Sequence, residues 1–458
     1  MPKYLVSPPA AGSPTRPIVF GSIEEEPQDL ILMGRLNEQG PLRDLFMDVT
    51  AESVVAIFGK RGSGKSYTLG VMAEGICTVE PRTSLGRCSR RKGALLLDTL
   101  NVFWSLANPF LSAADRERFP RELRRVDAWS IEVPQLDVRV WIPAGFRNPH
   151  SPDSYIDFSI APSELSAEDI ASLLEVDAQD LMGQLLAEAR EKAVSVRPNF
   201  SFDDMLGILE SDSEIEEYYA EATRRGARQR LRAVAMLPVF NSTAPTPLRD
   251  LLVAGRLSVV ELGDIPNSLR TVLASVLLKR IHRERAGAAD AEKQLALNTR
   301  LSQAERDRLR HFLALTIPPS WVLIDEAQNI LPSSREVKSS EAVLQFVREG
   351  RNFGLSFALT SQQPSAVDQR ILAQADTVIC HKLTVAQDMT RMRENLKSAE
   401  PMEVKLGGGT LELMDWLRSL EMGKALVTNT EYDRVFAIEV RPRVTPHGGT
   451  GFRSDVAE

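Results

Sequence analysis

The stretch VVAIFGKRGSGKSYTLG, residues 54–70, decides the fold of this chain. An apolar run is followed at residues 59–66 by the pattern G-x-x-x-x-G-K-[ST], and then by a segment compatible with a helix. In this order, glycines let backbone N–H groups face phosphates, and the helix N-terminus adds a favourable dipole. The alternative is a chance glycine-rich turn, which the flanking strand and helix disfavour. The stretch therefore predicts a P-loop NTPase.

This loop supplies the expected nucleotide contacts. Lys65 is expected to contact the β and γ phosphates, and the Ser66 hydroxyl is expected to bind Mg²⁺. ATP and Mg²⁺ are therefore the expected substrate and cofactor, and the expected activity is ATP hydrolysis. The residues expected to bind the nucleotide are Gly59, Lys60, Arg61, Gly62, Ser63, Gly64, Lys65, Ser66 and Tyr67.

Further apolar runs alternate with helical stretches along the chain. They lie at residues 94–98, 138–142, 257–262, 321–325, 355–361 and 377–380. Nearly continuous aliphatic runs are typical of strands that helices cover on both faces. We therefore expect an α/β fold with a largely parallel central sheet.

Composition and helical periodicity divide the chain into five segments. The N-terminal segment is rich in Pro, Ala, Ser and Gly and is expected to be a flexible arm. More than a hundred residues between two of the strands show only helical spacing of apolar residues, so we expect an inserted helical subdomain there. Part of a second polar helical stretch, residues 277–314, is expected to form an exposed hairpin or a mobile segment. The expected segments are the flexible arm 1–30, an ATPase core segment 31–145, the helical insertion 146–250, a further ATPase core segment 251–430, and a C-terminal strand and tail 431–458.

The run WVLIDEAQNIL, residues 321–331, ends an apolar strand with two acids. Adjacent carboxylates are rare at a core margin, because an unpaired charge is costly there. Asp325 is expected to hold Mg²⁺ through water, and Glu326 to act as the general base on the attacking water. The alternative is a solvated strand end.

Two more segments carry candidate catalytic side chains. The strand in LSFALTSQQPS, residues 355–365, ends near the expected ligand crevice, where Gln362 is placed to sense the γ-phosphate or to position water. A polar strand cap is the alternative. In FVREGRNFG, residues 346–354, Arg348 and Arg351 are equal candidates for stabilising a transferring phosphoryl group, unless they only cap a helix C-terminus.

Bulk composition excludes several classes of protein. The three cysteines have no metal-ligand spacing, and no run of 18 apolar residues occurs, so we expect a cytoplasmic protein without a membrane span. The five histidines support no catalytic role. The net charge of -7 argues mildly against nucleic-acid binding. Two basic runs, 224–232 and 279–285, are candidates for phosphate contacts or solvated helix faces.

With these motifs in place, the sequence resembles the HerA branch of the HerA/FtsK superfamily of ring ATPases. The resemblance is carried by GRL (34–36), the phosphate-binding loop, IDEAQNILP (324–332), the run from 348 to 379 and VRPRVTPHGG (440–449). It implies a RecA/FtsK-like core in which Lys65 and Ser66 bind phosphate and Mg²⁺ and Glu326 is the catalytic glutamate. It also places Gln362 at the sensor position and assigns Arg351, rather than Arg348, as the arginine finger that acts on a neighbouring subunit.

The same resemblance implies a homohexamer that encloses double-stranded DNA and acts as an ATP-driven translocase or helicase. A partner nuclease similar to NurA, or another effector enzyme, is implied in DNA end processing or anti-phage defence. One alternative is a scaffolding ring that organises an effector with DNA movement secondary or absent. A conjugation-type motor is a weaker alternative, because such motors usually bring membrane segments or a membrane partner. The sequence departs from the branch in two ways. About fifty residues precede the loop, where a β-barrel is typical, and the acid expected downstream of Asp98 is replaced by Asn101 or a neighbour. Residues 333–340, with Arg335 and Lys338, are a candidate pore loop.

Overall fold

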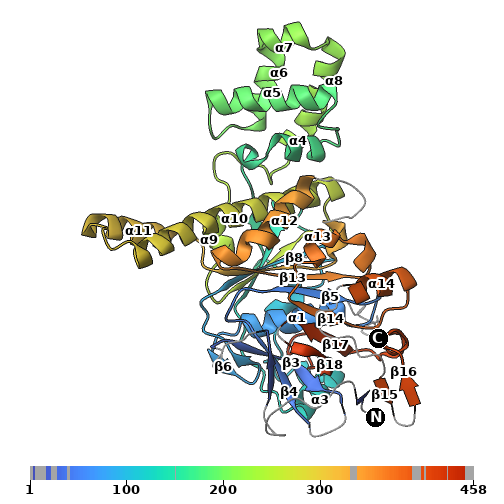
Figure 1. The fold of residues 1–458 in the computed structure, drawn as a ribbon. Helices are drawn as coiled ribbons and strands as arrows, with labels where there is room; N and C mark the ends of the chain where they lie inside the picture. Colours follow the sequence, from blue (N-terminus) through green and yellow to red (C-terminus); the bar gives the residue numbers. More distant parts are fainter. Residues whose placement is uncertain are drawn as a thin grey trace.

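The apolar runs of the sequence form neighbouring strands of one large sheet (Figure 1). The computed structural model describes residues 4–5, 17–21, 28–38, 42–149, 151–330, 338–394, 404–406, 409–430 and 432–448. Each predicted strand of the core is present. The two strands that follow the run at residues 321–331, β13 and β14, have the predicted bounds.

Eight strands of this sheet are parallel to one another, as the apolar runs predicted. In order across the sheet they are β10 (Ile156–Phe158), β9 (Val138–Pro143), β11 (Leu257–Glu261), β8 (Gly93–Asp98), β12 (Ser320–Ile324), β13 (Leu355–Ser361), β5 (Val54–Phe58) and β14 (Thr377–Cys380). The phosphate-binding loop follows β5, and β12 and β13 lie on the same side of it. The carboxyl ends of these three strands therefore form one edge.

The sheet continues beyond β14 with antiparallel neighbours. These strands are β17 (Lys424–Asn429), β18 (Tyr432–Val440), β3 (Leu30–Leu36), β4 (Asp44–Asp48) and finally β2 (Ile18–Phe20), which runs parallel to β4. A short hairpin, β6 (Arg82–Thr83) and β7 (Gly86–Arg87), joins β3, and a separate small sheet contains β1 (Tyr4–Leu5), β15 (Val404–Leu406) and β16 (Gly409–Leu411).

Both faces of the parallel sheet are buried, which explains why its strands are apolar without alternation. Val54, Ala56 and Phe58 of β5 point into one hydrophobic cluster, whereas Val55 and Ile57 point into the cluster on the opposite face. Successive side chains of a strand point to opposite faces, so helices must cover both.

Fifteen α-helices are described. They are α1 (Lys65–Ile76), α2 (Asp115–Arg118), α3 (Pro120–Ala128), α4 (Ala167–Leu173), α5 (Leu181–Val196), α6 (Phe202–Ser211), α7 (Ser213–Tyr218), α8 (Glu221–Ala235), α9 (Leu248–Leu251), α10 (Asn267–Leu297), α11 (Gln303–Leu315), α12 (Lys338–Glu349), α13 (Gln369–Leu372), α14 (Ala386–Glu394) and α15 (Leu413–Ser419). Within the described residues, no helix combines the length and the apolar character needed to cross a bilayer.

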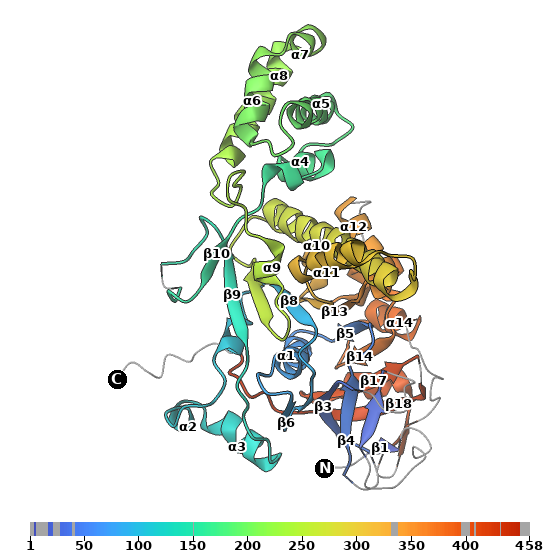
Figure 2. The same ribbon diagram turned by 90° about the vertical axis from the view of Figure 1, so that its left-hand side faces the viewer.

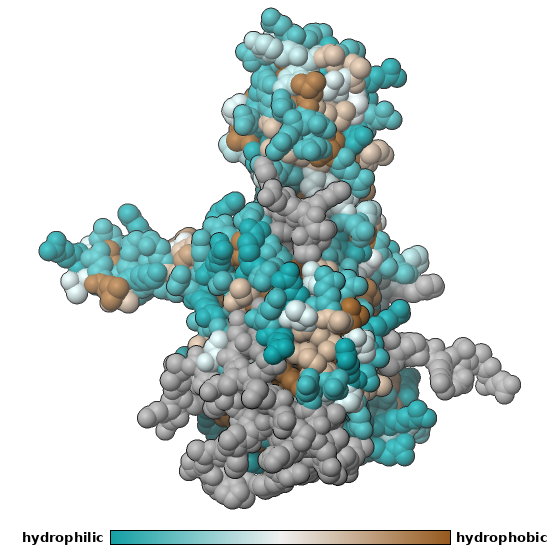
Figure 3. All heavy atoms as spheres, turned by 45° about the vertical axis from the view of Figure 1, so that its right-hand side comes forward, coloured by the Kyte–Doolittle hydropathy of each residue, from teal (hydrophilic) through white to brown (hydrophobic). Residues whose placement is uncertain are grey.

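Two helical elements project from the sheet (Figures 1 and 2). Helices α4 to α8 form a lobe above the body, and the far ends of α10 and α11 extend sideways as an arm. No residue of α11 is buried, so its side of the arm is open to solvent. Most of the lobe and the arm is hydrophilic in the view of Figure 3, with small apolar patches.

The expected helical insertion needs one correction. Residues 156–158 form strand β10, which pairs in parallel with β9 and extends the sheet by one strand. Three residues are too few for a period to be visible in the sequence. We therefore propose that the helical subdomain begins after β10 rather than at residue 146.

The expected flexible arm also needs a correction. Ile18 and Phe20 of β2 are buried, and β2 pairs with β4 at the antiparallel end of the sheet. The expectation of a flexible segment is wrong for residues 18–20, because their apolar side chains find a core through a distant strand. Residues 6–16 and 22–27 of the expected arm lie outside the described residues.

Candidate nucleotide site

The phosphate-binding loop joins β5 to α1 with the geometry that its glycines predict. Gly62 and Gly64 have φ angles of 74° and 118°, the left-handed region in which a side chain is strained. A Cβ at Gly59 would lie 2.4 Å from the Ser63 hydroxyl, so only glycine fits there. Helix α1 then begins at Lys65, and its N-terminus faces the loop.

Lys65 is nearly buried, with its ammonium directed into the loop. Its Nζ lies 3.5 Å from the Lys60 carbonyl oxygen and 3.4 Å from Oε1 of Glu326. The side chains of Lys65 and Glu326 are 4% and 3% exposed, so solvent screens this ion pair little. The structure thus brings the expected phosphate-binding lysine and the expected general base into contact.

The other expected nucleotide contacts differ in exposure. Lys60, Arg61 and Gly62 are exposed at the loop tip, while Ser63 is buried and donates to the Lys60 carbonyl at 2.7 Å. The side chain of Tyr67 is engaged elsewhere: its hydroxyl accepts a hydrogen bond from the backbone N–H of Arg443 at 2.6 Å. The Tyr67 hydroxyl therefore contacts the segment after β18.

Asp325 lies at the end of β12, next to the loop. Its Oδ1 accepts hydrogen bonds from the Ser66 hydroxyl at 3.0 Å and from the Thr360 hydroxyl at 2.7 Å. Its Oδ2 is buried and has no hydrogen-bond partner. Burial raises the pKa of Asp325 to about 6.

The pairing of Ser66 with Asp325 fits a magnesium site. Mg²⁺ prefers oxygen ligands and binds nucleotide with few protein side chains and several waters. The unpartnered Oδ2 atom of Asp325 is an oxygen that a hydrated cation would satisfy. Among the described residues no group of three or more His, Cys, Asp or Glu forms a metal site, so a cation here would depend on Ser66, Asp325 and the phosphates.

Glu326 is held by a small network of amides. Gln362 donates to its Oε1 at 2.5 Å, and Gln328 donates to its Oε2 at 2.7 Å. Gln328 in turn accepts a hydrogen bond from the Ser361 hydroxyl at 2.9 Å. The sequence predicted Gln362 beside the phosphate chemistry; it did not single out Gln328, although that residue follows Glu326 by only two positions.

The backbone at Glu326 is strained. Its φ and ψ angles of 49° and 60° lie in the left-handed region, which costs a residue with a side chain on the order of 1–2 kcal/mol. The hydroxyl of Thr360 accepts a hydrogen bond from the Glu326 N–H at 2.9 Å and helps to hold this conformation. Strain of this kind is concentrated at functional sites, where the surrounding structure enforces it.

Asp98 is a second buried acid on this edge. Burial and the neighbouring Asp325 raise the pKa of Asp98 to about 7, and its oxygens accept from the N–H groups of Leu100 and Phe103. Asn101, at the position where an acid was expected, accepts from the N–H of Gly263 at 2.8 Å. This hydrogen bond connects the loop after β8 to the loop after β11. A carboxylate at the same position could accept the bond but could not donate one, as an amide can.

The side chain of His381 lies next to Gly59 and Gly64 of the phosphate-binding loop. Its Nδ1 lies 2.9 Å from the Lys424 carbonyl oxygen, to which it donates, and its Nε2 accepts from the Thr68 hydroxyl at 2.8 Å. Burial lowers the pKa of His381 to about 4, so the ring is neutral at physiological pH. No periodicity marked this residue in the sequence; its only signal is its place directly after β14.

A buried ionic cluster joins α1 to the segment after β18. Glu74 of α1 pairs with Arg441 at 2.7 Å and with Arg443 at 3.3 Å, and all three side chains are at most 1% exposed. The same carboxylate accepts from the N–H groups of Val444 and Thr445. The cluster positions the helix that begins with Lys65, and it was missed because the partners are more than 360 residues apart in sequence.

Arg351 lies away from the phosphate-binding loop. It belongs to the turn η4 (Gly350–Phe353) before β13, at the edge of the sheet where β5 begins rather than ends. Four residue steps along β5, about 13 Å, separate the two edges. Arg348, exposed in the last turn of α12, also precedes β13 and therefore lies towards the same edge as Arg351. Neither guanidinium reaches the loop of its own chain.

Both basic runs of the sequence are largely paired with acids. In α8, Arg224 and Arg228 pair with Glu221. In α10, Lys279 pairs with Asp169 and Arg280 pairs with Glu164. The expected pore loop stays a prediction, because residue 335 and the side chain of residue 338 lie outside the described residues.

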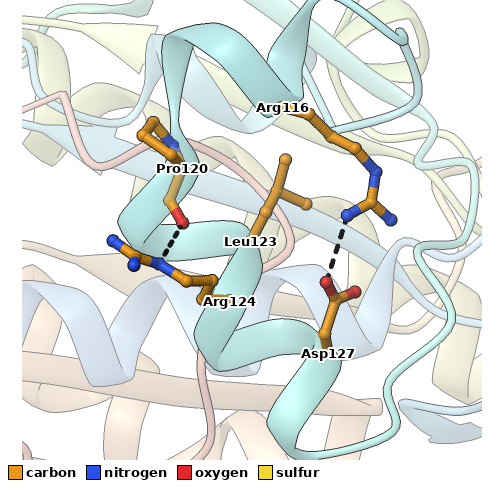
Figure 4. Close-up of a pocket in the computed structure, with 5 residues that line it drawn as sticks. All are labelled: Arg116, Pro120, Leu123, Arg124 and Asp127. Atoms are coloured by element: carbon orange, nitrogen blue, oxygen red, sulfur yellow. Dashed lines mark hydrogen bonds and ion pairs between the residues drawn. The ribbon is translucent and has the colours of Figure 1, made fainter.

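A surface cavity of about 290 Å³ lies between α2 and α3, and no residue of the phosphate-binding loop lines it (Figure 4). Two arginines line it, but Arg116 pairs with Asp127 at 3.1 Å and Arg124 donates to the Pro120 carbonyl at 3.0 Å. Because these guanidiniums already have partners, this cavity is a weaker phosphate site than the loop.

The chain matches two family models. Residues 43–281, more than half of the 458 residues, match the model described as the central domain of helicase HerA. Residues 270–401 match the model described as zonular occludens toxin (Zot).

Similar curated proteins are archaeal helicases. The DNA double-strand break repair helicase HerA of Pyrococcus furiosus is 25% identical over 181 residues, which cover 38% of this chain and 30% of that protein. A probable helicase of Methanocaldococcus jannaschii is 29% identical over 112 residues, 24% of this chain and 19% of that protein. The matched segment thus spans less than a third of the length of either relative.

Solved structures of low sequence identity share the fold. VirB4 of Thermoanaerobacter pseudethanolicus superimposes with a TM-score of 0.53 at 13% identity, over 92% of this chain and 98% of that one. The bacterial conjugative coupling protein TrwB superimposes with a TM-score of 0.50 at 12% identity, over 87% of each chain. The phosphate-binding loop and the match over residues 43–281 show that the chain is a P-loop NTPase that belongs to the HerA family.

Proposed function

We propose that this chain hydrolyses ATP as part of a homohexameric ring that moves along double-stranded DNA. The observation that carries the proposal is the separation of its functional groups. Lys65, Asp325, Glu326 and Gln362 meet at one edge of the sheet, whereas Arg351 lies at the opposite edge. Because Arg351 does not reach the loop of its own chain, it is placed most simply to act on the site of a neighbouring copy.

The chain's own residues suit each step of hydrolysis. The loop N–H groups and Lys65 bind the β and γ phosphates, and Lys65 exchanges its contact with Glu326 for the phosphates. Glu326 then accepts a proton from the attacking water, while Gln362 and Gln328 hold its two oxygens in place. Mg²⁺, held by Ser66 and Asp325, would neutralise charge on the β and γ phosphate oxygens.

Arg351 of the adjacent subunit is proposed to stabilise the charge that develops on the transferring phosphoryl group. A planar guanidinium with five donors suits phosphate oxygens. Its exposure, 43% of the side chain, leaves it accessible to a second copy. Mixing Glu326→Gln subunits with Arg351→Ala subunits should restore some of the ATPase activity that each variant lacks alone.

DNA as the polymer is proposed from the family and from the relatives named as DNA repair helicases. A partner nuclease of the NurA kind, or another effector enzyme, is proposed on the same ground, in end processing or anti-phage defence. We place the activity in the cytoplasm, because the three buried cysteines are free thiols that suit a reducing compartment.

The test compares ATP hydrolysis with and without linear duplex DNA at low salt. We expect duplex DNA to stimulate phosphate release and the stimulation to fall as salt rises, because phosphate contacts release counterions. ATP-dependent displacement of a triplex-forming strand from the duplex should accompany it and should be absent in Glu326→Gln. An ATPase with neither response would contradict translocation.

A scaffolding ring is the second candidate. The net charge of -7 and the pairing of basic residues such as Arg228 and Lys279 with acids favour it. Such a ring would hydrolyse ATP at the same rate with and without DNA and would change the activity of the bound effector. The ATPase comparison therefore separates the two candidates.

A further inference from the structure

The surroundings of Arg351 assign a role to a residue outside the nucleotide site. The Arg351 guanidinium pairs with the carboxylate of Asp376, the residue before β14, and lies 3.4 Å from the Gln374 carbonyl oxygen. Asp376 is 19% exposed, so its carboxylate is closer to the core than the guanidinium that it holds.

Asp376 is itself fixed to the start of β5. Its Oδ2 accepts a hydrogen bond from the Val54 N–H at 2.8 Å, and its own N–H donates to the Val54 carbonyl at 2.8 Å. Its carbonyl oxygen accepts from the Thr430 N–H at 3.0 Å. Since β5 continues directly into the phosphate-binding loop, Asp376 connects Arg351 to the strand that carries the nucleotide site of the same chain.

The turn that bears Arg351 is held from its other side by α10. Arg285, 2% exposed, donates to the Phe353 carbonyl at 2.8 Å and to the Ile317 carbonyl at 3.2 Å. Gly354 closes the turn with a φ angle of 78°. With the backbone fixed in this way, the direction of the Arg351 guanidinium depends mainly on what its long side chain contacts.

We infer that Asp376 is a positioning residue for the arginine finger: it holds Arg351 in the direction required by the triphosphate of a neighbouring copy. The inference rests on the proposed function, in which Arg351 acts in trans. One carboxylate occupies some of the guanidinium's five donors and leaves the others for phosphate oxygens. Through Val54, the same residue links a subunit's own loop to the finger that it offers to its neighbour.

The variant Asp376→Asn tests this role, because asparagine keeps an acceptor for the Val54 N–H and removes the charge that holds Arg351. We expect kcat to fall by roughly 10- to 100-fold, as for a misplaced catalytic group. Nucleotide affinity should not change, because the variant's own loop is intact. Asp307→Asn, at an exposed pair with Arg310 on α11, is the matched control and should retain wild-type activity.

Mixed rings separate a misplaced finger from a damaged site. When Asp376→Asn subunits are mixed with Glu326→Gln subunits, activity should return. The intact nucleotide sites of the Asp376→Asn subunits then receive the correctly placed Arg351 of the Glu326→Gln subunits. Mixed with Arg351→Ala, Asp376→Asn should gain no activity, because neither subunit offers a positioned finger. The opposite pattern, rescue by Arg351→Ala alone, or full activity of Asp376→Asn by itself, overturns the inference.

The mixture of Glu326→Gln with Arg351→Ala reports on the proposed function independently. If that mixture is inactive, a finger in trans is refuted, whatever Asp376→Asn does. If that mixture is active and Asp376→Asn is rescued only by Arg351→Ala, the trans finger stands and the role of Asp376 is refuted. Melting temperature and nucleotide binding of each variant confirm that folding is retained.

Discussion

Replacing Glu326 with glutamine is the sharpest test of the catalytic assignment. Glutamine has nearly the same shape and keeps one oxygen that can accept from Gln328 or Gln362, so the change removes mainly the charge and the basicity. Loss of a general base costs about 100- to 10,000-fold in rate, equivalent to about 3–5.5 kcal/mol. We expect a fall in kcat of this size with the ring intact.

The same change should not weaken nucleotide binding. In the structure Lys65 lies 3.4 Å from the Glu326 carboxylate, which competes with phosphates for the ammonium. Removing the negative charge frees Lys65, so the affinity for ATP should be unchanged or higher, by up to about tenfold, which corresponds to about 1.4 kcal/mol.

Phosphate release measured by a coupled assay gives kcat, and titration with a fluorescent nucleotide gives the affinity. Glu210→Gln, at an exposed pair with Arg232 in the helical lobe, is the control and should behave as wild type. A Glu326→Gln protein that releases phosphate within tenfold of the wild-type rate would refute the role of Glu326 as base. Loss of ATP binding would refute the competition for Lys65.

Three further changes test other groups of the site. Glu74→Gln should lower the free energy of unfolding by about 3–5 kcal/mol, measured by urea titration, because it leaves the buried Arg441 without its counter-charge; the exposed Glu80→Gln should have little effect. His381→Gln should make the free energy of unfolding depend less on pH in the acid range. In the wild type, burial lowers the pKa of His381 from 6.5 to about 4 on folding. The neutral ring therefore contributes about 3 kcal/mol of stability above pH 6.5, and this contribution is lost as the pH falls towards 4. Thermal melts at several pH values measure it, and an unchanged acid limb would contradict the buried neutral ring. Asp325→Asn should abolish the tightening of nucleotide binding by Mg²⁺ while metal-free binding persists; a retained magnesium effect would exclude Asp325 from the cation site.

Local sequence patterns predicted the centre of the fold well. The strands β13 and β14 have the bounds that their apolar runs predicted, and a helix follows the phosphate-binding loop as predicted, although α1 begins at Lys65, two residues before the expected segment. These predictions succeed because a buried strand and a phosphate-binding loop each require particular residue types within a few neighbouring positions. Strand β10 and strand β2 were missed, because each contains only three residues and depends on a distant partner.

Within the site, sequence predicted the residues but not all of their contacts. The nearness of Gln362 to Glu326 could be expected, since parallel strands place their carboxyl ends at one edge. The supporting residues His381 and Gln328 could not, because their roles come from hydrogen bonds made only when the chain is folded. The site assignments themselves stay predictions until the variants above are measured.

The sequence alone determined that the chain is a P-loop NTPase with a mainly parallel sheet, because glycine, lysine and apolar residues at short spacing specify a strand, a phosphate-binding loop and a helix. Only the tertiary structure decided that Glu74 would be neutralised by Arg441 and Arg443, and that Arg351 would lie a strand's length from its own loop beside Asp376. The physical reason is the same in both cases: a buried charge must find its partner in space, and the sequence does not record which distant residue the fold brings to it.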